Sequence, residues 1–208
     1  LAWGFGPDAL YDRLEIPTQT PDITLPKVID YIQQICRSQP IEAVGLGLFG
    51  PCDIDPLSAH YGCIVDSPKL AWRDCHVVEA IIAVCDINVV VTTDVNAAAL
   101  GEGRWGAARD VSDYIYLTVG TGIGGAVVVD GELIYKNKHP EMGHVLVRSA
   151  TGSDFKGVCP YHAHCLEGMA SGPAIKARWG MSSALHLEPT HPAWDDEAYY
   201  LAQGLMAY

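Results

Sequence analysis

The sequence is poor in positive charge. Its 208 residues include 13 Lys and Arg against 25 Asp and Glu, which gives a formal net charge of −12. No basic cluster offsets this background, so a surface for nucleic acid or for an anionic membrane is not expected. No apolar run is long enough to span a bilayer, and no repeat or low-complexity segment occurs. The composition therefore favours chemistry on small molecules.

The cysteines do not suggest a disulfide framework. There are seven, an odd number at irregular spacing. With no secretory signal, this pattern predicts a reduced, cytoplasmic protein. Five of them are expected to act as small hydrophobic residues, namely Cys36, Cys52, Cys63, Cys75 and Cys85.

Cysteine and histidine are concentrated between residues 144 and 165. Cys159, His162 and Cys165 are spaced Cys-x2-His-x2-Cys, and His144 lies upstream as a fourth candidate. Tetrahedral Zn²⁺ prefers these ligands, and four of them would form a closed, structural site. His164 could replace His162, because the spacing does not decide between them. Burial without a metal is the alternative, but the loop is rich in Gly, Ser and Pro and offers no apolar face.

Two glutamates flank this predicted zinc site. Glu141 lies three residues before His144, and Glu167 lies two residues after Cys165. A bound metal would fix both carboxylates relative to each other, which suits recognition of a polyol through its hydroxyl groups. The alternative is that both are ordinary exposed glutamates.

A glycine-rich run follows the apolar strand predicted at 113–119. Glycine allows close backbone approach and positive φ, so backbone N–H groups here could converge on phosphate oxygens. The run lacks the Lys of a Walker A loop and does not open a helix as a dinucleotide fingerprint does. A plain hairpin turn is the alternative. The candidate phosphate-binding residues are Thr118, Gly120, Thr121, Gly122, Gly124 and Gly125.

Asp94 comes directly after a predicted buried strand and before an Ala-rich helix. Open α/β sheets place ligands at the carboxyl ends of their strands, so the position suits a catalytic carboxylate. The alternative is helix capping by Thr93, Asp94 or Asn96.

Hydrophobic periodicity predicts an α/β chain of two domains. An N-terminal α/β domain spans 1–109, and a C-terminal domain with the glycine-rich run and the zinc loop spans 110–208. Residues 1–7 show no strong period. The expected strands are 9–17, 41–49, 87–92, 113–119, 126–129 and 132–135, with an Asp130-Gly131 hairpin turn between the last two. The expected helices are 21–38, 77–84, 95–103, 173–179 and 195–208.

Six motifs, taken together and in order, resemble the ROK family of sugar kinases, and most of all its fructokinase branch. The resemblance covers residues 9 to about 180. The motifs are Gly45-Leu-Gly-Leu-Phe-Gly-Pro51, Ser67-Pro-Lys69 with Trp72, Thr93-Asp-Val-Asn96 continuing to Glu102, Thr118 to Gly125, His139-Pro-Glu-Met-Gly-His144, and Cys159 to Gly168.

This resemblance implies a two-domain ribonuclease-H-like (actin-like ATPase) fold and transfer of the γ-phosphoryl group of ATP, with Mg²⁺, to the 6-hydroxyl of a hexose, D-fructose first. It implies that Asp94 is the general base and that Thr118 to Gly125 form the second phosphate loop. The sugar site or its support would comprise Asn96, Glu141, His144 and Glu167. Zinc would be held by His144, Cys159, His162 and Cys165, and the protein would form a homodimer.

Two features of the family are not matched. The family begins with an Asp-x-Gly-Gly-Thr-Lys type phosphate loop, which residues 1–7 do not resemble, and its C-terminal glycine-rich segment is absent. The resemblance thus implies a fold incomplete at both ends, and leaves the activity of the 208 residues open. The alternatives are a zinc-stabilised sugar-binding remnant without kinase activity and glucokinase or mannokinase specificity. A sugar-responsive regulator would need a winged helix and a basic face, which the sequence lacks.

Overall fold

The computed structural model describes residues 1–181 and 187–208. These residues form two compact units, each described here by itself. The first comprises Leu1–Tyr114 and Val128–His139, and the second Ile115–Val127 and Pro140–Tyr208. In the described ranges, no helix combines the length and the apolar character that a membrane span requires. The division of the chain at residue 110 into the two domains of the family stays a prediction.

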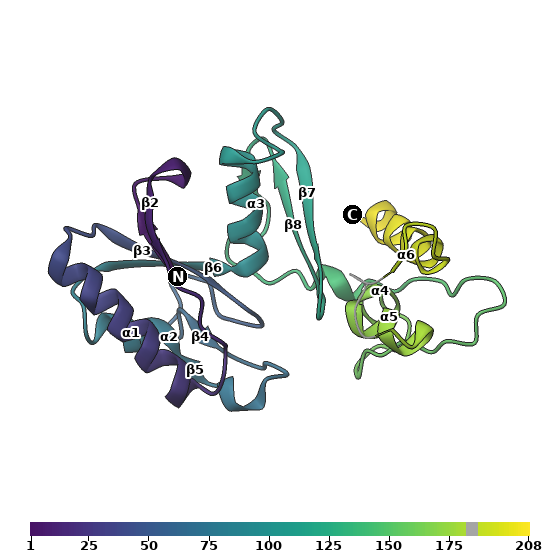
Figure 1. The fold of residues 1–208 in the computed structure, drawn as a ribbon, viewed down its shortest axis with the longest axis horizontal. Coiled ribbons are helices and arrows are strands. Elements are labelled where there is room, and N and C mark those ends of the chain that lie inside the picture. Colours follow the sequence, from purple (N-terminus) through teal and green to yellow (C-terminus); the bar gives the residue numbers. More distant parts are fainter. Residues whose placement is uncertain (182–186) are drawn as a thin grey trace. The chain divides into compact units, whose positions relative to one another are not determined.

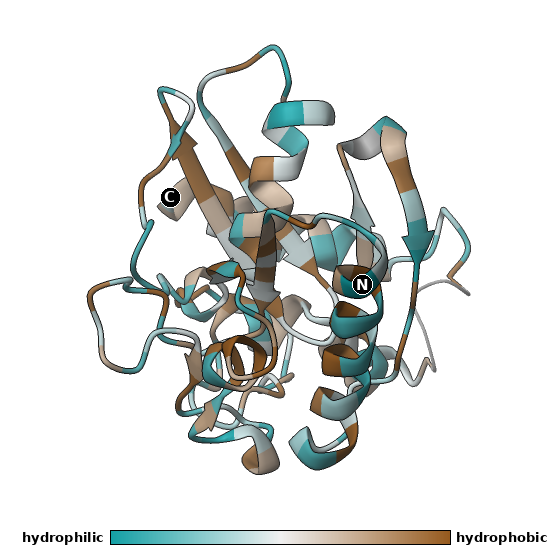
Figure 2. Ribbon diagram, turned by 90° about the vertical axis from the view of Figure 1, so that its left-hand side faces the viewer, coloured by the Kyte–Doolittle hydropathy of each residue, from teal (hydrophilic) through white to brown (hydrophobic). Residues whose placement is uncertain are grey.

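The first unit is built on helix α1 (Pro21–Ser38) and on two parallel strands, β3 (Ala43–Leu48) and β6 (Asn88–Thr93) (Figure 1). Pro21 begins α1, where its missing N–H costs no helical hydrogen bond. The helix predicted at 21–38 is confirmed, and its apolar residues Val28 and Ile32 pack on the core next to the strands. Brown and teal bands alternate along this helix in Figure 2, as expected of an amphipathic helix.

The β3–β6 pair sets the position of the candidate base. Its register aligns Gly47 with Thr92 and Leu48 with Thr93. Helix α2 (Val77–Ile82) precedes β6, and helix α3 (Asp94–Trp105) begins directly after it. The strands and helices predicted for residues 41–103 are confirmed to within two residues at each end.

The strand predicted at 9–17 is found at Leu10–Arg13, shorter than expected and preceded by a strand that was not predicted. Strands β1 (Ala2–Gly4) and β2 (Leu10–Arg13) form an antiparallel hairpin around the 3-10 turn η1 (Pro7–Ala9). Trp3 and Tyr11 stack across it with ring centroids 4.8 Å apart. Strands of three and four residues are too short for a period to be read in sequence, and their partner is set by the turn.

The segment between β3 and α2 is anchored by a tryptophan. It contains the short antiparallel strands β4 (Cys63–Ile64) and β5 (Cys75–His76) and the 3-10 turn η2 (Leu70–Trp72). Trp72 is buried, and its Nε1 donates to the carbonyl of Gln19 at 2.7 Å. Phe49 meets the Trp72 ring edge-on, and Lys69 Nζ lies 3.8 Å from the centre of the Phe49 ring. The Phe49 and Trp72 motifs therefore meet at one point.

A sheet of three strands follows, in the order β7 (Tyr114–Val119), β8 (Ile123–Val129) and β9 (Glu132–Leu133). The predicted Asp-Gly hairpin is confirmed, with φ of 52° at Asp130 and 75° at Gly131, as in a type I′ turn. Strand β8 begins at Ile123 and not at residue 126. Gly124 and Gly125 therefore lie in the strand, outside the turn in which they were expected.

The rest of the second unit is largely helical. It contains the 3-10 turn η3 (Met142–His144) and helices α4 (Leu166–Ala170), α5 (Gly172–Trp179) and α6 (Ala193–Ala207), so both predicted C-terminal helices are confirmed. Leu166, Met169 and Tyr200 are fully buried in its core. Arg178 of α5 donates to the carbonyl of Met169 at 2.8 Å and pairs with Asp196 of α6 at 3.2 Å. One arginine thus ties three helices together.

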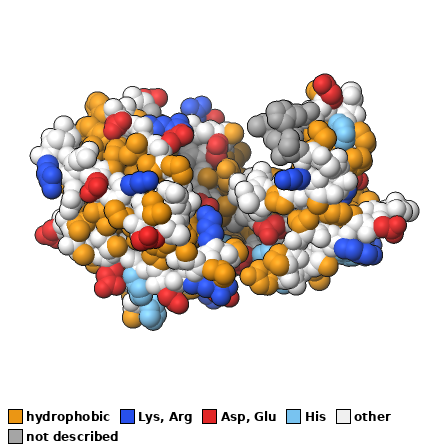
Figure 3. Space-filling view, turned by 60° about the horizontal axis from the view of Figure 1, so that its bottom comes forward, with side chains coloured by type: hydrophobic (Ala, Val, Ile, Leu, Met, Phe, Trp, Pro, Cys, Tyr) orange, Lys and Arg blue, Asp and Glu red, His pale blue; other side chains and the backbone are white. Residues whose placement is uncertain are grey.

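Surface charge is mixed. On the face drawn in Figure 3, Lys and Arg side chains are interspersed with Asp and Glu and form no continuous basic patch. The expectation of no nucleic-acid partner stays a prediction.

Glu197 of α6 should make stability depend on pH. It is 6% exposed, and within the described residues its carboxylate oxygens have no hydrogen-bond partner. Burial raises its pKa from 4.5 to about 7, against the opposing effect of Arg178 and with a small contribution from Asp196. The folded state therefore holds a proton that the unfolded state releases, and the unfolding free energy should fall by about 2–3 kcal/mol between pH 4.5 and pH 7.

Glu197→Gln should remove this fall. Denaturant unfolding at several pH values should find the variant similar to the parent near pH 4.5 and more stable near pH 8. Asp195→Asn, at an exposed position of the same helix, is the matched control and should follow the parent. Parallel pH profiles for parent and Glu197→Gln would show that Glu197 does not titrate as described.

Candidate active site and metal centre

In the first unit, Asp94 is exposed at the start of α3, directly after the carboxyl end of β6. Its Oδ1 accepts a hydrogen bond from Val95 N at 2.9 Å. Thr93, not Asp94, is the N-cap, because Thr93 Oγ1 accepts from Asn96 N at 3.1 Å. Within the described residues, Asp94 Oδ2 makes no hydrogen bond. The capping role that competed for Asp94 thus belongs to its neighbour, and the carboxylate faces solvent.

Asn96 lies below this surface. Its side chain is buried, and Nδ2 donates to Thr92 Oγ1 at 3.1 Å and to the Tyr135 carbonyl at 3.5 Å. In this arrangement the amide links β6 to the segment after β9. Its expected role in the sugar site stays a prediction, and the contacts shown are structural.

Gly47 allows α3 to begin close to β3. A Cβ at residue 47 would lie 3.1 Å from the Ala97 Cβ and 3.4 Å from the Asp94 Cα. A side chain here would therefore require the first turn of α3 to move by a few tenths of an ångström. Gly47, but not Gly45, thus has a packing reason that bears on the position of Asp94.

In the second unit, the turn between β7 and β8 consists of Gly120, Thr121 and Gly122. Gly120 N donates to the Gly122 carbonyl at 2.9 Å, and Gly172 N donates to the Gly120 carbonyl at 2.8 Å. The turn is therefore tied to the start of α5. Thr118 and Thr121 are exposed, so their hydroxyl groups are accessible to a ligand, whereas both backbone polar groups of Gly120 already form hydrogen bonds.

Glu167 holds the end of the same turn. Its Oε2 accepts from Ile123 N at 3.0 Å. A Cβ at residue 122 would lie 2.6 Å from this oxygen, so the close approach requires glycine there. The glutamate expected to bind sugar is thus in contact with the glycine-rich turn, a role that the sequence does not reveal because the two lie 44 residues apart.

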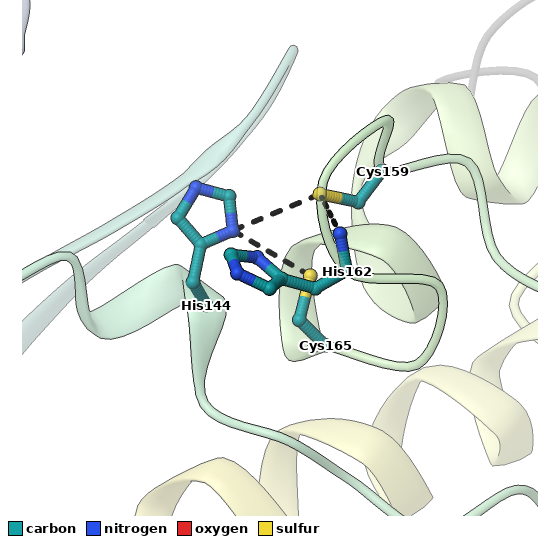
Figure 4. Close-up of side chains that lie close together, drawn as sticks. All are labelled: His144, Cys159, His162 and Cys165. Carbon is teal, nitrogen blue, oxygen red and sulfur yellow. Dashed lines mark hydrogen bonds between the residues drawn. The ribbon is translucent and has the colours of Figure 1, made fainter.

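The four expected zinc ligands come together in the second unit. Figure 4 shows that His144, at the end of η3, faces the loop that carries Cys159, His162 and Cys165. One donor atom from each lies within 4.8 Å of all the others. His144 Nδ1 is 3.8 Å from Cys159 Sγ and 3.5 Å from Cys165 Sγ. Ligands held about 2.0–2.3 Å from a tetrahedral Zn²⁺ are separated by similar distances.

His162, rather than His164, completes this group. The backbone carbonyl of His164 instead accepts from Val147 N at 2.9 Å. The geometry therefore favours His162 over His164, and the identity of the fourth zinc ligand stays a prediction.

The environment of the sulfurs suits metal-bound thiolates. Backbone N–H groups of His162 and Gly168 donate to Cys159 Sγ and Cys165 Sγ, both at 3.3 Å. Burial raises the pKa of Cys165 to about 11, with a further contribution from Cys159. A divalent cation would reverse this effect, because it deprotonates a coordinating thiol. The two thiols and two imidazoles therefore fit zinc.

Glu141 is positioned to orient His144. Its Oε2 lies 3.6 Å from His144 Nε2, on the side of the ring away from the sulfurs. Carboxylates commonly hold the second nitrogen of a metal-binding histidine in this way. Glu141 adopts a left-handed backbone conformation with φ of 51°, which is costly for a residue with a side chain. The two glutamates thus contact different parts of the unit, one the metal cluster and the other the glycine-rich turn.

Two residues of structural importance are not evident from sequence. Thr93 caps α3, so Asp94 does not have to. The one feature of the sequence that suggests this role is the position of Thr93 directly before a predicted helix. Arg178 lies over the Phe155 and Tyr200 rings, at 4.4 and 4.9 Å from their centroids. No local pattern distinguishes it from a surface arginine.

Residues 9–199 match the sequence pattern of the ROK family. The chain belongs to the ROK family. It is 44% identical over 199 residues to a putative fructokinase of Bacillus subtilis, covering 96% of this chain and 65% of that protein. It is also 39% identical to a fructokinase of Pediococcus pentosaceus, covering 92% of this chain and 65% of that protein.

Among solved structures, a ROK hexokinase from Thermus thermophilus superposes with a TM-score of 0.66 at 26% identity. The alignment covers 93% of this chain and 67% of that one. This ROK chain therefore has the actin-like ATPase fold predicted from its motifs. It spans slightly less than two thirds of the length of the two fructokinase relatives.

Proposed function

We propose that this ROK chain belongs to an ATP-dependent hexose kinase that converts D-fructose to fructose 6-phosphate. The observation that supports this most directly is the exposed carboxylate of Asp94, which does not cap α3. The chain that carries it is 44% identical to a protein named a putative fructokinase and 39% identical to one named a fructokinase. The proposal also includes a cytoplasmic location, a homodimer and a domain boundary near residue 110.

Asp94 acts as the general base in this proposal. It accepts the proton of the sugar 6-hydroxyl while that oxygen attacks the γ-phosphorus of ATP and ADP leaves. The carboxylate needs an unoccupied oxygen for this step, and Oδ2 supplies it. The hydrogen bond from Val95 N to Oδ1 limits rotation of the side chain.

The glycine-rich turn binds phosphate in the same proposal. Gly120, Thr121 and Gly122 form the turn, Thr118 lies near the end of β7, and Gly124 and Gly125 lie in β8. These six residues are the proposed phosphate-binding residues. Mg²⁺ bound with the nucleotide would screen the charge of its phosphates. Glu167 fixes the end of the turn by accepting a hydrogen bond from Ile123 N. A displacement of α4 would therefore also move the residues that are proposed to bind the phosphates.

Zinc has a structural role in the proposal. His144, Cys159, His162 and Cys165 would hold it in a closed site with no position open for substrate. Cys165 also caps α4, which carries Glu167. The metal therefore supports both glutamates, Glu141 through His144 and Glu167 through α4, and these residues with Asn96 serve the sugar site or support it.

A chimaera tests the proposal. Residues 1–208 replace the matching segment of the Bacillus subtilis relative, and hexose-dependent ADP formation is measured with fructose, glucose and mannose. We expect kcat/KM to be highest for fructose. Binding of fructose without ADP formation would favour the sugar-binding alternative, and a higher kcat/KM for glucose or mannose would favour the other specificity. A folded chimaera with neither binding nor turnover would refute the proposal.

A further inference from the structure

Two cysteines outside the metal centre lie side by side in the first unit. Cys36 is in the last turn of α1, and Cys85 follows the end of α2. Both are half-buried, and both line a cavity of about 380 Å³ together with Arg37 and Asp86. Their side chains also pack on the same hydrophobic core. A small molecule that enters this cavity would therefore meet both residues.

The shared cavity and the shared core place the two residues near each other. Burial raises the pKa of Cys36, and the neighbouring Cys85 side chain raises it further. A different pair, Cys63 and Cys75, lies on adjacent positions of β4 and β5, but Cys63 is 2% exposed and lines neither described cavity. Proximity and access are therefore combined at Cys36 and Cys85.

We propose that Cys36 and Cys85 form a reversible disulfide when the protein meets a low-molecular-weight disulfide. One protein thiolate attacks a sulfur of the small disulfide, which forms a mixed disulfide and expels one small thiol. The second protein thiolate then attacks the protein sulfur of the mixed disulfide and expels the other small thiol. Two protein thiols are oxidised and one small disulfide is reduced to two thiols, so protons and electrons balance.

The bond would close a chain segment that contains all of β3 and α2. It would tie the end of α1 to the residues that lead into β6, and so restrain the strand that ends directly before Asp94. Closing a segment of this length reduces the entropy of the unfolded chain. The expected effect is a rise in Tm of about 5–10 °C.

The test is incubation of the chain with oxidised glutathione, followed by peptide mapping without reduction and by thermal unfolding. We expect one peptide pair joining Cys36 to Cys85, the rise in Tm, and reversal of both by dithiothreitol. The reaction should be faster at pH 9 than at pH 7, because burial keeps the Cys36 thiol protonated near neutrality.

Single variants provide the controls. Cys36→Ser and Cys85→Ser should each carry a glutathione adduct on the remaining cysteine and show no rise in Tm, whereas Cys75→Ser should behave as the parent. Separate adducts on both Cys36 and Cys85 of the parent would overturn the proposal, as would a bond between other cysteines. A 36–85 bond that leaves Tm unchanged would overturn the predicted restraint.

Discussion

Asp94→Asn is expected to lower kcat by about 10²-fold or more while KM for fructose and the unfolding free energy stay near those of the parent. The amide cannot accept the hydroxyl proton, but its oxygen can still accept the hydrogen bond from Val95 N. Because Thr93 caps α3, the substitution leaves the helix start intact. The measurement is steady-state ADP formation in the chimaera, with denaturant unfolding of the same variant.

Two further variants separate catalysis from capping. Thr93→Ala removes the cap and should lower the unfolding free energy by about 1 kcal/mol or more. Asp86→Asn, at an exposed position before β6, is the matched control for loss of a carboxylate and should be nearly silent in kcat. If Asp94→Asn turns over at the parent rate, Asp94 has no part in the proton transfer.

Loss of the proposed zinc site should lower the thermal stability of the chain by a large amount. Protein purified without a chelator is expected to contain about one zinc ion per chain, and the Cys159→Ser variant should contain much less. A ligand present at 100 times its Kd stabilises the folded state by about 2.7 kcal/mol, which corresponds to a Tm about 5–10 °C higher for a chain of this size. Elemental analysis and thermal unfolding, each with and without a chelator, give the two readouts.

The paired histidines make this test specific. His162→Ala should lose zinc, and His164→Ala should retain it, because only His162 belongs to the cluster. The two variants remove the same side chain at positions two residues apart. Zinc loss in His164→Ala with retention in His162→Ala would show that the loop folds differently around the metal, and stoichiometric iron or no metal in the parent would exclude zinc.

The effect should also reach the glycine-rich turn. Cys165 is the N-cap of α4, and Glu167 in the first turn of that helix accepts from Ile123 N. We therefore expect chelation to weaken nucleotide binding by the chimaera as well as to lower Tm. Cys159→Ser should weaken fructose affinity for the same reason, through Glu141 and Glu167.

The sequence predicted those features that depend on neighbouring residues. The helix at 21–38 and the Asp130-Gly131 turn follow from local patterns, and the structure confirms both. The members of the Cys/His cluster were also suggested by spacing, because three of them lie within seven residues. Their chemistry limits the metals they can hold before any fold is known.

Tertiary structure decided where a choice depended on residues distant in the chain. Whether Thr93 or Asp94 caps α3, and whether His162 or His164 joins the cluster, depends on backbone direction, which no spacing specifies. The contact of Glu167 with the β7–β8 turn brings together residues 44 positions apart. Burial of Gly125 against Leu117 and Met142 similarly places it in a packed strand instead of a turn. Periodicity and spacing describe interactions along the chain, whereas packing and hydrogen bonding between distant segments determine which candidate side chain is left free to react.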